Sequence, residues 1–151
     1  MKTTKLALAG LATLVFVNLA TAQAEDEHSK KLTHHHETIL KESEKIQDEK
    51  VTAEKGHTAE MEKHLESAKI QHAKMQSKLT PEQKEATKAH HEAIEKQHAT
   101  ATASHKVLKD ELEKSYPDKV KVKKHAAKIH ESITAAEAEH NEIKKKTGAT
   151  E

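Results

Sequence analysis

The sequence predicts an all-α protein, an antiparallel up-down four-helix bundle, on three observations. The strong helix formers Ala, Glu, Lys, Gln and Leu dominate the chain after residue 24. Candidate breaks within this region are few, at Gly56, Pro81 and Pro117. Apolar residues and histidines recur at steps of three and four, the pattern of helices that pack along their length. Short connections between such helices make neighbours antiparallel.

The breaks divide the chain into four expected helices, at about 27–55, 58–79, 81–115 and 117–146. Gly56 is expected to end the first helix, with Thr58 capping the second. If Gly56 is instead tolerated inside a helix, at a cost of about 1 kcal/mol, the first helix runs over 27–79 and the bundle has three long helices. Thr80 and Gln83 predict a capping box at the next helix start.

The first 24 residues have the layout of a secretory signal peptide. Two lysines precede an apolar run over residues 6–19, and small residues follow it at the spacing that signal peptidase needs. The apolar run is shorter than the roughly 20 residues of a bilayer span. We therefore expect cleavage after Ala24, with Ala22 as the alternative. The product would be periplasmic or secreted, with no stable membrane insertion.

Residues 25–147 are expected to form one metal-binding helical domain, followed by a frayed C-terminus at 148–151. Without Lys2 and Lys5 the chain carries 24 basic and 25 acidic residues, a formal charge of −1, which argues against nucleic acid as a partner. The absence of Cys excludes disulfides and zinc–thiolate sites. No nucleophile–base pattern or glycine-rich phosphate loop is present, so we expect no enzyme. A monomer is favoured.

Histidine is the unusual feature of the composition, with 14 residues, several of them on the predicted packing seams. An imidazole in a core costs free energy unless its nitrogens find partners. If two helices run antiparallel on either side of Pro81, residues that lie at the same height have residue numbers that add up to about 162, twice the number of the turn residue. Three levels then present facing imidazoles: His57 with His105, His64 with His98, and His72 with His90 or His91.

Neutral imidazole is the commonest metal ligand, so the seams predict metal sites between helices. The ligands that this pattern predicts are His57, His64, His72, His91, His98 and His105. Second in rank are His90, His36 and His140. Glu60 and Glu95 lie within one helical turn of a seam histidine and could complete a site. The remaining histidines are interpreted as polar surface residues: His28, His34, His35, His125 and His130.

Nitrogen and carboxylate donors without thiolate favour Cu(II), Ni(II), Zn(II) or Co(II), with copper first in the affinity order. The segment Gly56–Lys74, GHTAEMEKHLESAKIQHAK, resembles the repeat of the small metal-binding protein family. These are histidine-rich periplasmic helical bundles that bind divalent metals, copper especially. The resemblance covers about 20 residues and implies that His57, His64 and His72 are ligands of a protein that sequesters or buffers metal. One departure is that His64 and His72 lie eight residues apart where seven are expected.

A second resemblance gives the alternative function. Leu79-Thr-Pro-Glu-Gln83 is similar to the Leu-Thr-x-x-Gln motif of periplasmic stress chaperones related to Spy and CpxP. Those proteins usually carry two copies of the motif and a basic concave face, whereas this chain has one copy and no Arg. This resemblance implies a helical stress chaperone without a dedicated metal role.

Overall fold

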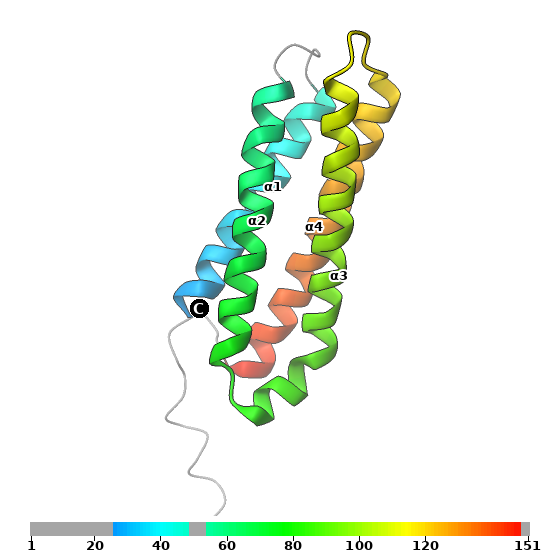
Figure 1. Ribbon diagram of the computed structural model, residues 1–151. Helices are drawn as coiled ribbons and strands as arrows, with labels where there is room; N and C mark the ends of the chain where they lie inside the picture. The colour runs from blue at the N-terminus through cyan, green and yellow to red at the C-terminus, as the bar shows by residue number, and fades with distance from the viewer. Residues whose placement is uncertain (1–25, 49–53, 149–151) are drawn as a thin grey trace, which may run out of the picture.

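The computed structural model describes residues 26–48 and 54–148, and within them the chain is a four-helix bundle. The helices are α1 Glu27–Asp48, α2 Glu54–Lys78, α3 Pro81–Leu112 and α4 Lys119–Thr147. They run alternately up and down, as the prediction required (Figure 1). Each packs against the next, and α1 also packs against α4 to close the bundle. The predicted signal peptide at 1–24 and residues 149–151 lie outside the described part.

Gly56 does not end the first helix, so that expectation is wrong. Gly56 is the third residue of α2 and has no positive φ, and α1 ends earlier, at Asp48. Thr58 is buried within α2 and does not cap it. The alternative of three long helices is also wrong, because α1 and α2 are separate elements. The sequence between α1 and α2 holds no Gly or Pro. A prediction based on helix-breaking residues therefore places the end of the first helix too late, at Gly56.

The other helix ends follow the expected capping chemistry. The Thr80 hydroxyl accepts from the Gln83 amide at 3.2 Å, and the Gln83 side chain accepts from the Thr80 amide at 3.0 Å, completing the predicted capping box. Capping therefore accounts for the Leu-Thr-x-x-Gln motif. Asp118 caps α4 through the amides of Val120 and Lys121. Gly148 ends α4 in the left-handed conformation, with φ 75°.

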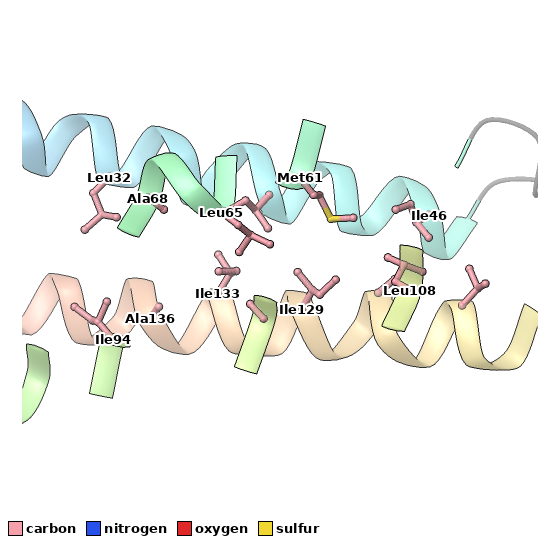
Figure 2. Packing of buried hydrophobic residues seen from close by; sticks show 14 of the residues in the cluster. Leu32, Ile46, Met61, Leu65, Ala68, Ile94, Leu108, Ile129, Ile133 and Ala136 are labelled. Carbon is pink, nitrogen blue, oxygen red and sulfur yellow. The ribbon is translucent and has the colours of Figure 1, made fainter. Parts of the chain in front are cut away.

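The heptad seams form the core. Every described seam residue of α3 and α4 is buried, as are those of α1 from Leu32 to Ile46. Figure 2 shows Ile46 of α1 and Ile129 of α4 on the facing sides of these two helices, at different places along the core, with residues of α2 and α3 such as Met61 and Leu108 in the same space. Within the described residues the core holds no Phe, Tyr or Trp ring, since Tyr116 is almost fully exposed. Histidines occupy several of the positions that remain.

Seven histidines are buried: His36, His64, His72, His91, His98, His105 and His140. The half of the bundle that holds the α2–α3 turn contains His72, His91 and His140. Near the middle of their helices lie His36, His64 and His98, and His105 lies towards the other end of α3. Among the helices of the described residues, we find none that combines the length and apolarity of a membrane span.

Candidate functional site

A chain of buried imidazoles crosses the bundle and draws on all four helices. Its members share the inward face of their helix and are less than 4% exposed: His36 of α1, His72 of α2, His91 and His98 of α3, and His140 of α4. Heptad spacing places these side chains inward, because seam positions of a helix face its neighbours. Imidazole thus replaces hydrocarbon over about two helical turns of the core.

His72 and His91 form the first link of this histidine chain, at the α2–α3 interface. Nε2 of His72 lies 2.8 Å from Nδ1 of His91, and the ring centroids are 5.0 Å apart. The His98 ring stands nearly perpendicular to that of His72, at 89° and 5.9 Å between centroids. The pairing of His72 with His91 confirms one of the three levels that the index sums predicted.

His98 and His36 form the next link, between α3 and α1. Their Nε2 atoms are 2.8 Å apart, and Nδ1 of His36 lies 2.6 Å from a carboxylate oxygen of Glu137. A carboxylate only accepts, so Nδ1 of His36 carries a proton and donates it to Glu137. This hydrogen bond orients the His36 ring with its Nε2 towards Nε2 of His98.

Glu137 holds the far end of the histidine chain. Thr33 donates to its other oxygen at 3.2 Å, and Nδ1 of His140 lies 3.7 Å from Oε2. Nε2 of His140 is 2.8 Å from the Ser29 hydroxyl. Burial by itself would raise the pKa of Glu137, but hydrogen bonds from His140 and His36 outweigh it and the pKa lies well below its usual range. The carboxylate is therefore ionised and anchors two imidazoles.

Three rings of the histidine chain are held neutral. Burial, helped by the neighbouring imidazoles, lowers the pKa of His72 and His91 to about 4 and that of His98 to about 3. At neutral pH these rings carry no charge, so each has one nitrogen with a free electron pair. Nε2 of His91 is buried and has no hydrogen-bond partner among the described residues. It is a polar atom whose donor or acceptor capacity the fold leaves unused.

A groove between α2 and α3 leads to these rings. Three adjoining hollows of about 510, 530 and 500 Å³ follow the α2–α3 seam and share lining residues. His91 lines the first, His72 and His98 the second, and His105 the third. Glu95 lines the groove beside His98, as its position one turn away implied. Small molecules and ions can therefore approach one edge of the buried rings from solvent.

A second histidine cluster lies at the α1–α2 interface, nearer the surface. Nδ1 of His35 is 2.9 Å from Nδ1 of His64, and Nε2 of His64 is 2.9 Å from Oε1 of Glu60. The His34 ring lies 5.7 Å from that of His35 and 6.0 Å from that of His64. Burial and the facing His64 lower the pKa of His35. This cluster joins three imidazoles and one carboxylate.

The six predicted ligands thus fall into three groups. His72, His91 and His98 belong to one continuous histidine chain, and His64 belongs to the second cluster. His57 instead donates to Glu42 at 2.5 Å, and His105 donates to the Thr58 carbonyl at 2.8 Å. The pairs His64–His98 and His57–His105 do not form; each of the four rings turns to a different partner.

Sequence reasoning underrated several residues of these clusters. His36 and His140 were second in rank although both lie on a seam, and His34 and His35 were interpreted as surface residues. A run of three histidines necessarily turns more than one ring towards a neighbouring helix, which is the signal that could have identified His35. Glu137 lies three residues before His140, on the same face of α4. His90, also second in rank, lies at the side of α3 and donates to Glu139 at 2.7 Å.

Among the residues that the structure describes, no three His, Asp or Glu side chains converge in an arrangement ready to hold a metal ion. The contacts are pairwise: two imidazoles, or an imidazole and a carboxylate. Comparison of the chain with protein-family models, curated proteins and solved structures found no match. The family resemblance of the α2 segment therefore stays a prediction.

Proposed function

We propose that this protein binds and sequesters divalent transition metal ions through paired imidazoles between its helices. Cu(II) is the first choice, and Ni(II) and Zn(II) suit the same donors. The proposal includes no catalytic step. The observation that carries it is the contact between His72 and His91, two neutral rings whose nitrogens face each other at 2.8 Å beside a solvent groove.

Two facing neutral imidazoles become a donor pair through a change of tautomer and a small rotation that turns both electron pairs towards one ion. Moving the shared proton to the outer nitrogen of its ring leaves two electron pairs that face each other. For His91 the outer nitrogen is the unpartnered Nε2, so no hydrogen bond resists this change. Ligand nitrogens at about 2.0 Å from an ion and at right angles are about 2.8 Å apart, close to the spacing of this pair.

The low pKa values of these rings support binding near neutral pH. A metal competes with protons for an imidazole, and rings held neutral present no proton to displace. The ion would complete its coordination with water from the groove or with the adjacent ring of His98. Water ligands are usual where a protein supplies only two or three donors. The pairwise contacts of the metal-free protein are compatible with such a site.

The cluster of His34, His35, His64 and Glu60 supports a second site. Its His35–His64 contact of 2.9 Å repeats the spacing of the first pair, and the Glu60 carboxylate already contacts His64. Carboxylate with imidazole is a donor set that Zn(II) and Cu(II) accept. Its half-exposed position makes it the faster site to load. Sequestration needs only several sites of moderate affinity.

The proposal places the protein in the periplasm or outside the cell. The support is the signal-peptide layout of residues 1–24 and the absence of Cys. Imidazole and carboxylate donors remain usable under oxidising conditions, where thiolates are lost to disulfides. A histidine-based buffer fits that compartment.

Calorimetric titration with Cu(II), Ni(II) and Zn(II) near pH 7.4 tests the proposal. The variant His72→Gln/His91→Gln removes the carrying pair and keeps polar side chains of similar length. The matched control, His28→Gln/His125→Gln, removes two histidines that lie in ring contact with no other histidine among the described residues. We expect the control to keep the stoichiometry of the wild type and the pair variant to lose about one equivalent.

Circular dichroism of both variants checks that the helices remain. Equal metal uptake by the two variants would show that the histidine pair is no site. Uptake by the folded wild type no tighter than that of the same chain unfolded in urea would contradict sequestration by the fold.

A further inference from the structure

The end of the bundle formed by the α3–α4 connection carries apolar side chains that nothing in the described structure covers. Tyr116 is 93% exposed and Val120 is 78% exposed. Tyr116 and Phe16 are the only aromatic residues of the whole chain. Tyr116 is thus placed at this exposed tip and not in the core. In Figure 1 this connection projects at one end of the molecule, and the α2–α3 turn lies at the other.

A cluster of exposed lysines follows this connection at the start of α4. Between Lys119 and His130 there are five lysines and no acidic residue. All five side chains are exposed: Lys119, Lys121, Lys123, Lys124 and Lys128. Except for Lys128, which approaches Glu131 at 3.8 Å, none has a carboxylate within 4 Å among the described residues. We call Tyr116, Val120 and these five lysines the basic tip.

The carboxylates nearest the basic tip are already engaged. Glu111 accepts from Lys114 at 2.6 Å and from the Asp118 amide at 2.9 Å. Asp118 caps α4. Glu113 is the remaining exposed carboxylate on the connection. Over residues 113–128 there are six lysines against Glu113 and Asp118, so this stretch of the chain is positively charged.

This arrangement opposes the stability of α4. The first turn of α4 has no acidic residue and begins with Lys119 and Lys121, although the positive end of a helix dipole disfavours cations. Residues that disfavour the helix in which they lie are expected where they serve a function, such as binding a partner. The positive charge and the exposed ring together indicate an anionic partner with an apolar layer beneath its charges.

We propose that the basic tip docks the protein reversibly on an anionic phospholipid surface. Lysines near a bilayer are attracted to anionic headgroups, and tyrosine settles at headgroup level with its ring in the apolar boundary and its hydroxyl in water. Val120, one turn beyond the connection, enters beside it. The electrostatic attraction between a cation and an anionic lipid surface does not require the two parallel hydrogen bonds that an arginine can make. Lysine is therefore sufficient for it. A nucleic acid would use the lysines but leave the apolar pair unexplained.

The geometry of the bundle keeps this docking separate from the histidines. The His72–His91 pair lies in the half of the bundle at the α2–α3 turn, away from the tip. A molecule attached by the basic tip therefore keeps that end in solution. The docking proposal does not rest on metal binding, and its assay is run with a chelator present.

Vesicle sedimentation with residues 25–151 tests the docking. This part contains all four helices and their buried core. Phosphatidylcholine vesicles are compared with vesicles containing about one third phosphatidylglycerol. The variant Lys121→Gln/Lys123→Gln/Lys124→Gln removes charge at the tip. Its matched control, Lys41→Gln/Lys74→Gln/Lys88→Gln, removes the same charge from exposed sites on α1, α2 and α3.

We expect binding to anionic vesicles only, at least a tenfold weaker partition of the tip variant, and less than a twofold change in the control. Tyr116 is the only fluorophore of residues 25–151, so its emission should be quenched by spin-labelled lipid in the bound wild type. Equal weakening of both variants, or binding without quenching, would overturn the proposal. So would tip-dependent binding to DNA or polyphosphate with none to vesicles, which would identify a soluble polyanion.

Discussion

His72 and His91 face each other across the α2–α3 interface with 2.8 Å between Nε2 and Nδ1, and the outer nitrogen of His91 is buried with no hydrogen-bond partner in the described part of the chain. Such a pair stabilises the core less than two aliphatic side chains would, because imidazole is polar and one of its nitrogens makes no hydrogen bond. The same features make it a metal donor pair. Stability and metal binding should therefore respond together to changes in this part of the core.

Metal should stabilise the folded chain against heat. An ion that binds only the folded state at about 100 times its Kd adds about 2.7 kcal/mol, which for a bundle of this size raises Tm by about 10 °C. Differential scanning calorimetry with and without Cu(II) or Zn(II) measures this shift. In His72→Gln/His91→Gln the shift should be smaller, and magnesium should produce none in either protein. An identical shift in the pair variant would place the metal elsewhere.

Acid should destabilise the metal-free protein. The pKa values of His72, His91 and His98 lie below 6.5, the value of an unfolded histidine, so below that pH the unfolded chain binds more protons than the folded one. Their stabilising effect is complete above pH 6.5 and is lost as pH falls towards 4. Each ring contributes a slope of about 1.4 kcal/mol per pH unit within this window. Urea unfolding with a chelator, between pH 7.5 and 5, measures it.

The variant His98→Leu should reduce that slope by about 1.4 kcal/mol per pH unit, since one of the three rings no longer titrates. Ile133→Val is the matched control, because it removes a buried methylene, costs about 1 kcal/mol and should leave the slope unchanged. An unchanged slope in His98→Leu would contradict the assignment of a neutral buried ring at this position.

Glu137→Ala should cost about 3 kcal/mol of unfolding free energy. It leaves the Nδ1 proton of His36 and the Thr33 hydroxyl in the core without their acceptor. Glu139→Ala is the comparison on the same helix. Its carboxylate pairs with His90 near the surface, so its loss should cost less than about 1 kcal/mol. Urea unfolding at pH 7.5 compares the two, and equal costs would mean that Glu137 is not an anchor.

Gly56→Ala should stabilise the protein by about 1 kcal/mol. Gly56 lies inside α2 without positive φ, and an added Cβ would meet no atom within 4 Å. Gly148→Ala should destabilise it, because Gly148 adopts a φ of 75°. Thermal unfolding distinguishes the two. A loss of stability in Gly56→Ala would restore the helix break at that residue.

The sequence by itself determined which side chains turn inward. Steps of three and four placed Leu32, Ile94 and Ile133 in the core, and the histidines at equivalent positions followed them because every seam position of a helix faces its neighbours. Local chemistry likewise determined the capping box at Thr80, since both of its hydrogen bonds lie within four residues.

Only the tertiary structure decided which neighbour each inward ring meets. An inward side chain in a four-helix bundle can reach either adjacent helix, and index sums about one turn consider only one of them. Near the α2–α3 turn His72 meets His91, as predicted. Farther along the same two helices the rings turn to α1 instead: His64 meets His35, and His98 meets His36. The partners of a buried imidazole depend on the packing of all four helices, which no single heptad pattern contains.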